Sequence, residues 1–245
     1  DACTVGDACS GGVCVPGATP APVQFCNNTG ITIPTVGAAT PYPSAIVVAG
    51  QSSHLCSTTV NLNGISHAFP DDIDLLLARS NGTNALIMSD VGGGIGVAAL
   101  NLTLSDAAAT LLPDQGPLVG GTFKPTNIGG GDTFAAPAPA PTGNSALTVF
   151  NGTDPNGTWN LWVSDQFSPN GGSMSGWCLN LVSVCTVNAE CSDGNPCTDD
   201  TCFGGGCVHT PNRASCDDGD ACTVGDQCGG GYGESFDGVT APALP

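Results

Sequence analysis

The placement of 14 cysteines constrains this chain more than any other feature of its sequence. Most of them lie in two flanking regions rich in Gly and Asp, with four or five residues between neighbouring cysteines and few apolar residues nearby. Segments of this kind cannot bury a core of their own and need covalent cross-links to fold. The CxxC pairs and Cys/His spacing that are typical of zinc sites are missing. The cysteines therefore predict disulfides and an oxidising compartment, as for a protein that is secreted or displayed on a cell surface.

All of the cysteines are disulfide candidates, and the sequence leaves their pairing open. They are Cys3, Cys9, Cys14, Cys26, Cys56, Cys178, Cys185, Cys191, Cys197, Cys202, Cys207, Cys216, Cys222 and Cys228. No signal peptide is visible at the start of the chain, and we expect that one was removed by processing. No apolar run is long enough to span a membrane, so we expect an extracellular protein without membrane insertion.

The charge of the chain limits its partners. Three Lys and Arg residues stand against 21 Asp and Glu residues, which gives a formal net charge of −18. A chain this acidic repels nucleic acid and anionic lipid, so basic partners or divalent cations are its natural counter-charges. Acidity that merely keeps an exported protein soluble is the simpler explanation. Many of the acids, however, cluster in short Asp/Asn/Gly loops, which favours calcium.

Composition divides the chain into five parts. These are a partial Cys-rich repeat (1–14), a Pro-rich linker (15–24), a Val/Ile/Leu/Thr-rich region (25–184), further Cys-rich repeats (185–233) and an extended tail (234–245). The linker should be extended and semi-rigid because of its prolines. A second Pro-rich run, 135–141, lies inside the central region, where it predicts a loop rather than a domain boundary.

The central region predicts an all-β fold. Apolar and polar residues alternate over eight short segments, and Asn-Gly, Asp-Pro or Gly-Gly turns separate them. These segments are 31–33, 57–62, 74–78, 85–88, 99–104, 146–150, 158–163 and 177–182. Such short strands favour a jelly-roll-like β-sandwich, flanked here by small, loop-rich repeats that are stapled by disulfides. Only residues 105–112 have a pattern that one or two turns of helix would fit.

The Cys-rich flanks contain an internal repeat. One copy spans 191–207, a second spans 216–228 without its last cysteine, and residues 1–14 form a third without its first. The heptapeptide DACTVGD occurs at Asp1 and again at Asp220. Chance does not readily produce identity over seven residues, so the chain looks like one period of a longer tandem array.

The tail and the incomplete terminal repeats predict contacts between copies of the chain. Three spaced apolar residues of the tail have no partner within their own repeat: Phe236, Val239 and Leu244. We expect the tail to add as a β-strand to a neighbouring copy, which would join subunits head to tail. Head-to-tail contacts that do not close give filaments. A frayed terminus, or the start of another folded domain, is the alternative.

Three segments of the central region resemble a known family. They are 62–75, 123–127 and 151–165, the last followed by Gly176-Trp177. They are similar to the P domain, the β-sandwich that follows the catalytic domain in kexin- and furin-type proprotein convertases and also occurs alone in large exported bacterial proteins. The resemblance covers the chain from about residue 25 to residue 184. It implies a β-sandwich that supports other domains and has no catalytic residues.

Cysteines also distinguish this chain from the P-domain pattern. Four of them lie in or beside the expected sandwich and suggest added disulfides: Cys26, Cys56, Cys178 and Cys185. The flanks in turn resemble the CTDC-type cysteine repeat of exported and cell-surface proteins, in segments 197–202 and 222–228. Both features agree with an exported protein.

Motifs of hydrolytic enzymes are missing. No G-x-S-x-G or G-T-S segment that would build a serine nucleophile is present. His67 lies where the resemblance implies a structural histidine at a strand end, and we expect a buried, hydrogen-bonded imidazole there. The pair Asp71 and Asp72 could serve glycoside hydrolysis, but aromatic residues, which form sugar platforms, make up only 5% of the chain. We therefore predict that the chain is not an enzyme.

Closely spaced carboxylates predict calcium as a cofactor. Asp71, Asp72 and Asp74 lie at the entrance of an expected strand and present hard oxygen ligands, with a solvated turn as the alternative. In the repeats, side-chain oxygens stand two residues apart around a glycine, and a further Asp precedes the next cysteine. The ligands expected there are Asp193, Asn195, Asp200, Asp218, Asp220 and Asp226. Asp and Asn that only form turns are the alternative.

Periodicity, disulfides and acidity predict a structural module, a calcium-stabilised subunit or repeat of a filament, surface layer or other extracellular array. An adhesin or carbohydrate-binding module is one alternative, since a β-sandwich without catalytic motifs suits that role equally well. An accessory segment of a large exported hydrolase, with its catalytic domain outside this chain, is the other.

Overall fold

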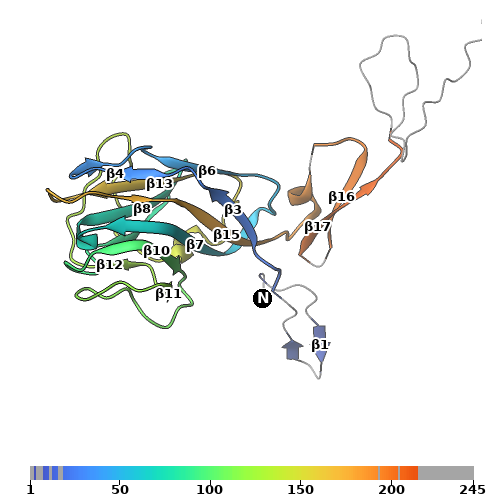
Figure 1. The fold of residues 1–245 in the computed structure, drawn as a ribbon. Coiled ribbons are helices and arrows are strands. Elements are labelled where there is room, and N and C mark those ends of the chain that lie inside the picture. Colours follow the sequence, from blue (N-terminus) through green and yellow to red (C-terminus); the bar gives the residue numbers. More distant parts are fainter. Residues whose placement is uncertain are drawn as a thin grey trace, which may run out of the picture.

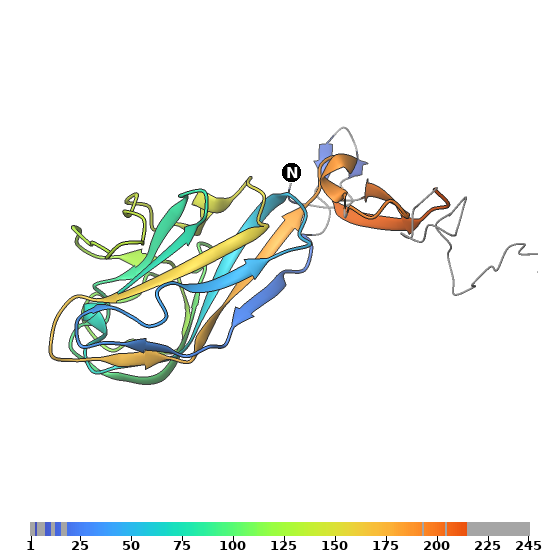
Figure 2. The ribbon, with the colours of Figure 1, turned by 90° about the horizontal axis from the view of Figure 1, so that it is seen from above.

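Two β-sheets pack face to face, and a small Cys-rich hairpin lies at one end of the sandwich (Figure 1, Figure 2). The computed structural model describes Cys3, residues 8–10 and 13–15, and residues 19–192, 194–203 and 205–214. Residues 8–10 and 13–15 are described by their backbone alone. Several predicted site residues, or their side chains, therefore lie outside the described part: Cys9, Cys14, Asp193, Cys216, Asp218, Asp220, Cys222, Asp226, Cys228, Phe236, Val239 and Leu244.

The first sheet has seven strands and is built around the 14-residue strand β7. In sheet order the strands are β11 (Gly121–Phe123), β10 (Val97–Leu104), β7 (His54–His67), β14 (Gly172–Met174) and β4 (Ile31–Ile33), while β15 (Gly176–Val184) pairs with β7 and β3 (Val23–Asn27) pairs with β15. Val60 and Leu62 of β7 are fully buried, because alternate side chains of a strand face the opposite sheet.

The second sheet has six strands. They are β12 (Thr126–Asn127), β9 (Asn84–Ser89), β8 (Ile73–Arg79), β13 (Gly157–Asp165) and β5 (Gly37–Ala38), with β6 (Ser44–Val48) also pairing with β13. Every residue of β8 and β9 is buried, so both faces of these strands are covered. The alternation expected for residues 74–78 is therefore wrong: β8 reads IDLLLAR because both of its faces are buried.

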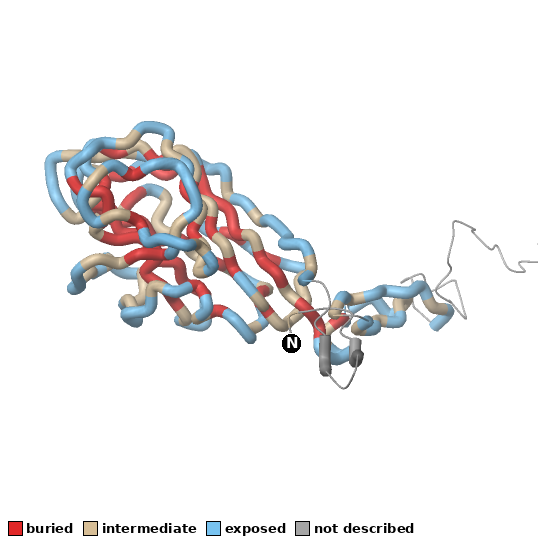
Figure 3. The backbone as a smooth tube through the Cα atoms, turned by 90° about the horizontal axis from the view of Figure 1, so that it is seen from below, coloured by how far each residue is buried: buried red, intermediate tan, exposed pale blue. Residues whose placement is uncertain are grey.

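The main core lies between the sheets, where the buried backbone in Figure 3 is concentrated. Its largest fully buried side chains include Trp159 and Trp177. Both indoles are hydrogen-bonded: Trp159 Nε1 donates to the Pro155 carbonyl and Trp177 Nε1 to Ser44 Oγ, each at 2.9 Å. A polar tip satisfied in this way lets a large aromatic ring be buried without an unpaired donor.

Disulfides join the sandwich and its flanks. The flanks contain the backbone hairpin of β1 (Ala8–Ser10) and β2 (Val13–Val15), and a second hairpin of β16 (Thr198–Phe203) and β17 (Gly206–Pro211) after the short 3-10 helix η3 (Asn188–Cys191). The pairs are Cys3–Cys56, Cys26–Cys178, Cys185–Cys202 and Cys191–Cys207. Cys197 is disulfide-bonded as well. The predicted all-β sandwich with disulfide-stapled flanks is confirmed.

Two local predictions were wrong. Residues 146–150 were expected to form a strand, but Leu147–Phe150 form the 3-10 helix η2. The Asp106 carboxylate accepts hydrogen bonds from the backbone N–H groups of Leu147, at 3.1 Å, and Thr148, at 2.7 Å. These N–H groups therefore bond to a side chain and not to a neighbouring strand. Residues 105–112, the expected helical turns, contain turns and bends but no helix.

The chain enters and leaves the sandwich at the same end. β3 is antiparallel to β15, with Val23 opposite Leu181, so the first strand begins where the last one ends. Cys3–Cys56 and Cys185–Cys202 connect both flanks to this end, which we call the tether end. The opposite end, the turn end, is formed by loops 68–72, 90–96, 128–132 and 166–171.

No helix in the described part of the chain has the length and apolarity that crossing a membrane requires. The three helical segments, η1 (Pro70–Asp72), η2 and η3, are single 3-10 turns within the described residues.

Candidate metal centre

Three carboxylates meet at the turn end of the second sheet. Asp74 lies on β8, Asp90 directly follows β9, and Asp132 lies in the loop after β12. One carboxylate oxygen of each lies within 4.8 Å of the others. Strand pairing explains the meeting: β8 is the antiparallel neighbour of β9, and β12 runs parallel to β9, so it ends at the same edge.

Neutral hydrogen-bond donors hold these carboxylates. Ser89 Oγ donates to Asp74 Oδ1 at 2.6 Å and lies 3.3 Å from Asp90 Oδ2. The Gln166 side-chain amide donates to Asp74 Oδ2 and, at 3.2 Å, to Asp132 Oδ1. Among the residues that the structure describes, no Lys or Arg side chain bonds to these acids. The negative charge of the cluster is therefore uncompensated by the chain itself.

The pKa of Asp74 is raised to about 7, chiefly because the carboxyl group is buried. The hydrogen bonds from Ser89 and Gln166 lower this pKa, whereas the charges of Asp132 and Asp90 raise it. Burial, followed by the charge of Asp132, likewise raises the pKa of Asp90. Carboxyl groups in this situation resist ionisation, because their charge is desolvated and faces like charges. A divalent cation would reverse this preference by supplying the missing positive charge.

Asp72 is a second buried acid beside the cluster. Asp72 is only 6% exposed. Burial raises its pKa, and the charges of Asp165, Asp71 and Asp90 raise it further while that of His67 lowers it. In addition, Asp71 Oδ1 is buried without a partner. A buried, unpaired carboxylate oxygen next to an acidic cluster is a group that a cation would be expected to satisfy.

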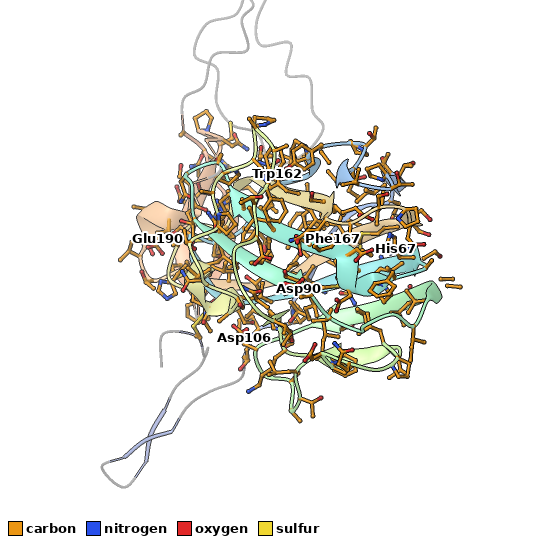
Figure 4. All side chains as sticks on the ribbon, turned by 90° about the vertical axis from the view of Figure 1, so that its left-hand side faces the viewer. His67, Asp90, Asp106, Trp162, Phe167 and Glu190 are labelled. Carbon is orange, nitrogen blue, oxygen red and sulfur yellow. A yellow bond between two sulfur atoms is a disulfide. The ribbon has the colours of Figure 1, made fainter. Side chains whose placement is uncertain are left out.

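His67 and Asp165 form a buried pair at the same end. His67 Nε2 lies 2.9 Å from Asp165 Oδ2, both side chains are fully buried, and His67 Nδ1 lies 2.8 Å from the carbonyl oxygen of Phe69. Burial raises the pKa of Asp165, and the hydrogen bond from His67 lowers it. The expectation of a buried, hydrogen-bonded imidazole is confirmed. Figure 4 looks onto the turn end, where His67, Asp90 and Phe167 are labelled.

The donor set of the centre fits a hard cation. Three carboxylates and the hydroxyl of Ser89 are oxygen ligands, and the Gln166 amide would offer its oxygen after a flip of its end group. Calcium takes six to eight oxygen ligands in flexible geometry, completed by water, whereas zinc and copper prefer nitrogen and sulfur. Asp74, Asp90 and Asp132 are therefore residues that could hold a hard divalent cation.

The structure separates the predicted calcium ligands. Of the set in the central region, Asp74 lies in the centre, and Asp71 and Asp72 lie beside it on η1. In the repeats, Asn195 Oδ1 accepts the Cys197 N–H at 3.0 Å, as a turn former does, and Asp200 Oδ1 pairs with His209 Nδ1 at 2.8 Å.

Sequence reasoning missed Asp90, Asp132 and Gln166. Asp90 precedes the run 92–94 and Asp132 follows the run 129–131, both of which consist of glycine. The two glycine runs predict loops. An Asp within two residues of each run was the signal that could have pointed to the site. Asp90 also has a left-handed backbone, with φ of 52°, a conformation that Asp tolerates better than most residues.

Two sulfur-containing clusters are explained by cross-links. Cys3, His54 and Cys56 lie close together, as do Cys185, Cys191 and Cys202. Each of these cysteines belongs to a disulfide, so none offers a thiolate to a metal.

No protein-family model matches the chain, and a search of curated proteins finds no significant match. Its function therefore has to be inferred from the metal centre and from the way the flanks are attached to the sandwich.

Proposed function

We propose that this chain is a non-catalytic extracellular structural module, a calcium-stabilised repeat or subunit of a filament, surface layer or other array. The attachment of both Cys-rich flanks to one end of the sandwich carries this proposal. Cys3–Cys56 and Cys185–Cys202 are the cross-links at this end. In a tandem array the Cys-rich segments would form a covalent spine, and each sandwich would project from it by its tether end.

The buried pair His67–Asp165 supports a structural role. A histidine–carboxylate pair acts in catalysis when its imidazole reaches a nucleophile or a substrate. Here both side chains are fully buried, and the imidazole bonds to Asp165 and the Phe69 backbone. The resemblance to the non-catalytic P domain points the same way. Purified protein should give no turnover above buffer with peptide, ester and glycoside substrates, and turnover lost in His67→Ala would overturn the non-catalytic proposal.

The exposed apolar residues of the turn end favour a second candidate, an adhesin or carbohydrate-binding module. The Phe69 side chain is 37% exposed and that of Phe167 is 61% exposed, and both adjoin the His67–Asp165 pair. Apolar groups that remain exposed near a polar centre often mark interaction sites. A glycan array probed with calcium-loaded protein tests this candidate, with Phe167→Ser as the variant and Phe203→Ser, on the hairpin at the other end, as its control.

Thermal unfolding in calcium and in chelator tests the main proposal. A cation that binds the native state alone raises stability by mass action. At calcium concentrations a hundredfold above the dissociation constant, the gain is about 2.7 kcal/mol, so the melting temperatures should differ by several degrees. Identical melts in calcium, magnesium and chelator would remove the cation from the proposal.

A further inference from the structure

A long irregular segment covers the outer face of the second sheet. Residues 129–143, which we call the strap, connect β12 to η2 without regular secondary structure of their own. Beneath the strap lies a separate apolar cluster, away from the main core. It consists of Leu76, Ala78, Leu86 and Trp162, with Tyr42, Phe134 and Ala138 packed against it. The strap therefore buries the outer face of the second sheet, as the first sheet buries its inner face.

The middle of the strap rests on aromatic rings. Tyr42 and Trp162 meet edge to face, with ring centroids 4.7 Å apart, and the Tyr42 hydroxyl donates to the Ala135 carbonyl at 3.0 Å. Trp162 is only 5% exposed, yet its Nε1–H has no hydrogen-bond partner among the residues that the structure describes. An unpaired buried donor makes this contact weaker than a fully satisfied one, because the indole lost water without gaining a hydrogen bond. The aromatic contacts of Tyr42 and Trp162 therefore do not by themselves hold the strap firmly on the sheet.

The strap is anchored firmly at the tether side. Asn84 Nδ2 donates to the Ala140 carbonyl at 3.1 Å, and Asn84 Oδ1 accepts the Thr142 N–H at 3.0 Å. The Thr142 hydroxyl adds a bond to the Asn84 carbonyl at 3.2 Å, and the Leu86 N–H bonds to the Asn144 carbonyl at 2.8 Å. All of these bonds join neutral groups, so no cation is needed to hold this side.

The anchor at the turn end is different, because it is the metal centre. Asp132, near the start of the strap, is held to the sheet by Gln166 at 3.2 Å. The same carboxylate faces Asp74 of β8 and Asp90, which directly follows β9. Like charges at this separation repel, and the more so in a partly buried site. Without a cation and with these carboxyls ionised, the described side chains offer Asp132 only the hydrogen bond from Gln166 against this repulsion, since its contact with Asp90 is a hydrogen bond only when one of the two carboxyls is protonated.

We propose that the metal centre is the latch of the strap: a bound divalent cation joins Asp132 to Asp74 and Asp90 and closes the strap over Trp162. This inference rests on the proposed calcium site. Loss of the cation releases the turn-end half of the strap, which swings on the Asn84–Thr142 anchor. The face thereby uncovered is apolar and aromatic, so calcium depletion turns a closed module into one with an exposed adhesive surface.

Hydrogen exchange with calcium or chelator tests the latch. For a peptide that covers residues 131–142, exchange should be at least tenfold faster in chelator than in calcium. Peptides from β13 serve as the internal control, and their exchange should change by less than twofold. Acrylamide quenching of the Trp162 signal, isolated by subtracting the spectrum of Trp162→Phe, should rise in chelator as well.

Two matched variants make the test specific. Asp132→Asn should make strap exchange the same in calcium and in chelator, because it removes the ligand that the strap contributes. Asp114→Asn removes the same charge from an exposed loop residue that bonds to its neighbour Gln115, and it should behave as the parent protein. Native β13 protection in both variants verifies that they are folded.

Calorimetry of calcium binding distinguishes a failure of the latch from a failure of the calcium site. If calcium binds but strap exchange stays the same in calcium and chelator, the latch is wrong and the calcium site survives. If calcium does not bind, the latch and the proposed cation fail together. Equal behaviour of Asp132→Asn and Asp114→Asn would also overturn the latch.

Discussion

Asp74 combines complete burial, two accepted hydrogen bonds and a raised pKa in one side chain. It is fully buried, it accepts hydrogen bonds from Ser89 and Gln166, and its pKa is raised to about 7 from an ordinary value of 3.8. A raised carboxyl pKa means that the folded protein holds its proton more tightly than the unfolded chain does. Without a cation, stability should therefore fall as the pH rises from about 4 to about 7, and then level off.

The substitution Asp74→Asn should change stability with opposite signs in the two metal states. In chelator at pH 8 the neutral amide removes a buried charge, so the variant should be at least as stable as the parent. The gain has an upper limit of about 4 kcal/mol, from roughly three pKa units at 1.36 kcal/mol each. In calcium the variant should be less stable, because a ligand is lost. Urea denaturation at pH 5 and pH 8 measures both effects.

The outcome that contradicts this assignment is a variant that is less stable by the same amount in calcium and in chelator. Asp74 would then be an ordinary hydrogen-bonded core residue. Ser89→Ala is a useful companion, since it removes the 2.6 Å hydrogen bond to Asp74 but no charge. It should weaken the fold in both metal states.

At the scale of elements, alternation and turn signals located most of the sandwich. Seven of the eight expected segments lie in strands, and β7 and β15 extend beyond the predicted ranges. Strands β5, β11 and β12, of two or three residues each, were missed because so few residues seldom show a periodicity, and β6 was missed although its burial alternates. Residues 146–150 have strand-like composition, but a distant carboxylate, Asp106, determines their conformation.

The candidate metal centre was only partly predictable, because residues distant in the sequence form it. Asp74 belongs to a local cluster that the sequence displays, whereas Asp90 and Asp132 come from separate loops. Strand pairing between β8, β9 and β12 brings these loops to one edge, and the sequence does not reveal this pairing. A site assembled from one strand and two separate loops cannot be recognised by spacing along the chain.

Asp106 is expected to act on η2 as a cap. Replacing it with Ala leaves two backbone N–H groups without their acceptor, and we predict a loss of about 1–3 kcal/mol in the free energy of unfolding. Asp106→Asn keeps one acceptor oxygen and should lose about half as much. Urea denaturation followed by tryptophan fluorescence measures both variants. No change in Asp106→Ala would show that η2 is held by its buried Leu147 and Phe150 alone.

The disulfide Cys26–Cys178 should matter more to the sandwich than Cys191–Cys207. It joins the paired strands β3 and β15 across 152 residues of sequence, whereas the second pair closes 16 residues in the flank. Replacing Cys26 and Cys178 together with Ala should cost the sandwich about 2–5 kcal/mol, because the unfolded chain regains freedom. Replacing Cys191 and Cys207 should leave the tryptophan-monitored transition within about 1 kcal/mol of the parent. Equal losses in the two double variants would contradict this ranking.

At the scale of the whole molecule, attachment at one end shapes what an array would look like. The paired strands β3 and β15 place the entry and the exit of the sandwich side by side (Figure 1). Negative-stain images of native material should therefore show sandwiches that project at regular intervals from a thin spine. Sandwiches that follow one another in line, with the spine passing through them, would contradict the arrangement.

Calcium titration by calorimetry tests the central claim most directly. The calcium-free parent protein should bind calcium with measurable heat, and Asp114→Asn should bind it equally well. Asp74→Asn and Asp90→Asn should each lose at least tenfold in affinity, because each removes a charged ligand from the same cation. Equal calcium affinity in the parent, Asp74→Asn and Asp90→Asn, or no binding by the parent, would contradict a calcium centre formed by Asp74, Asp90 and Asp132.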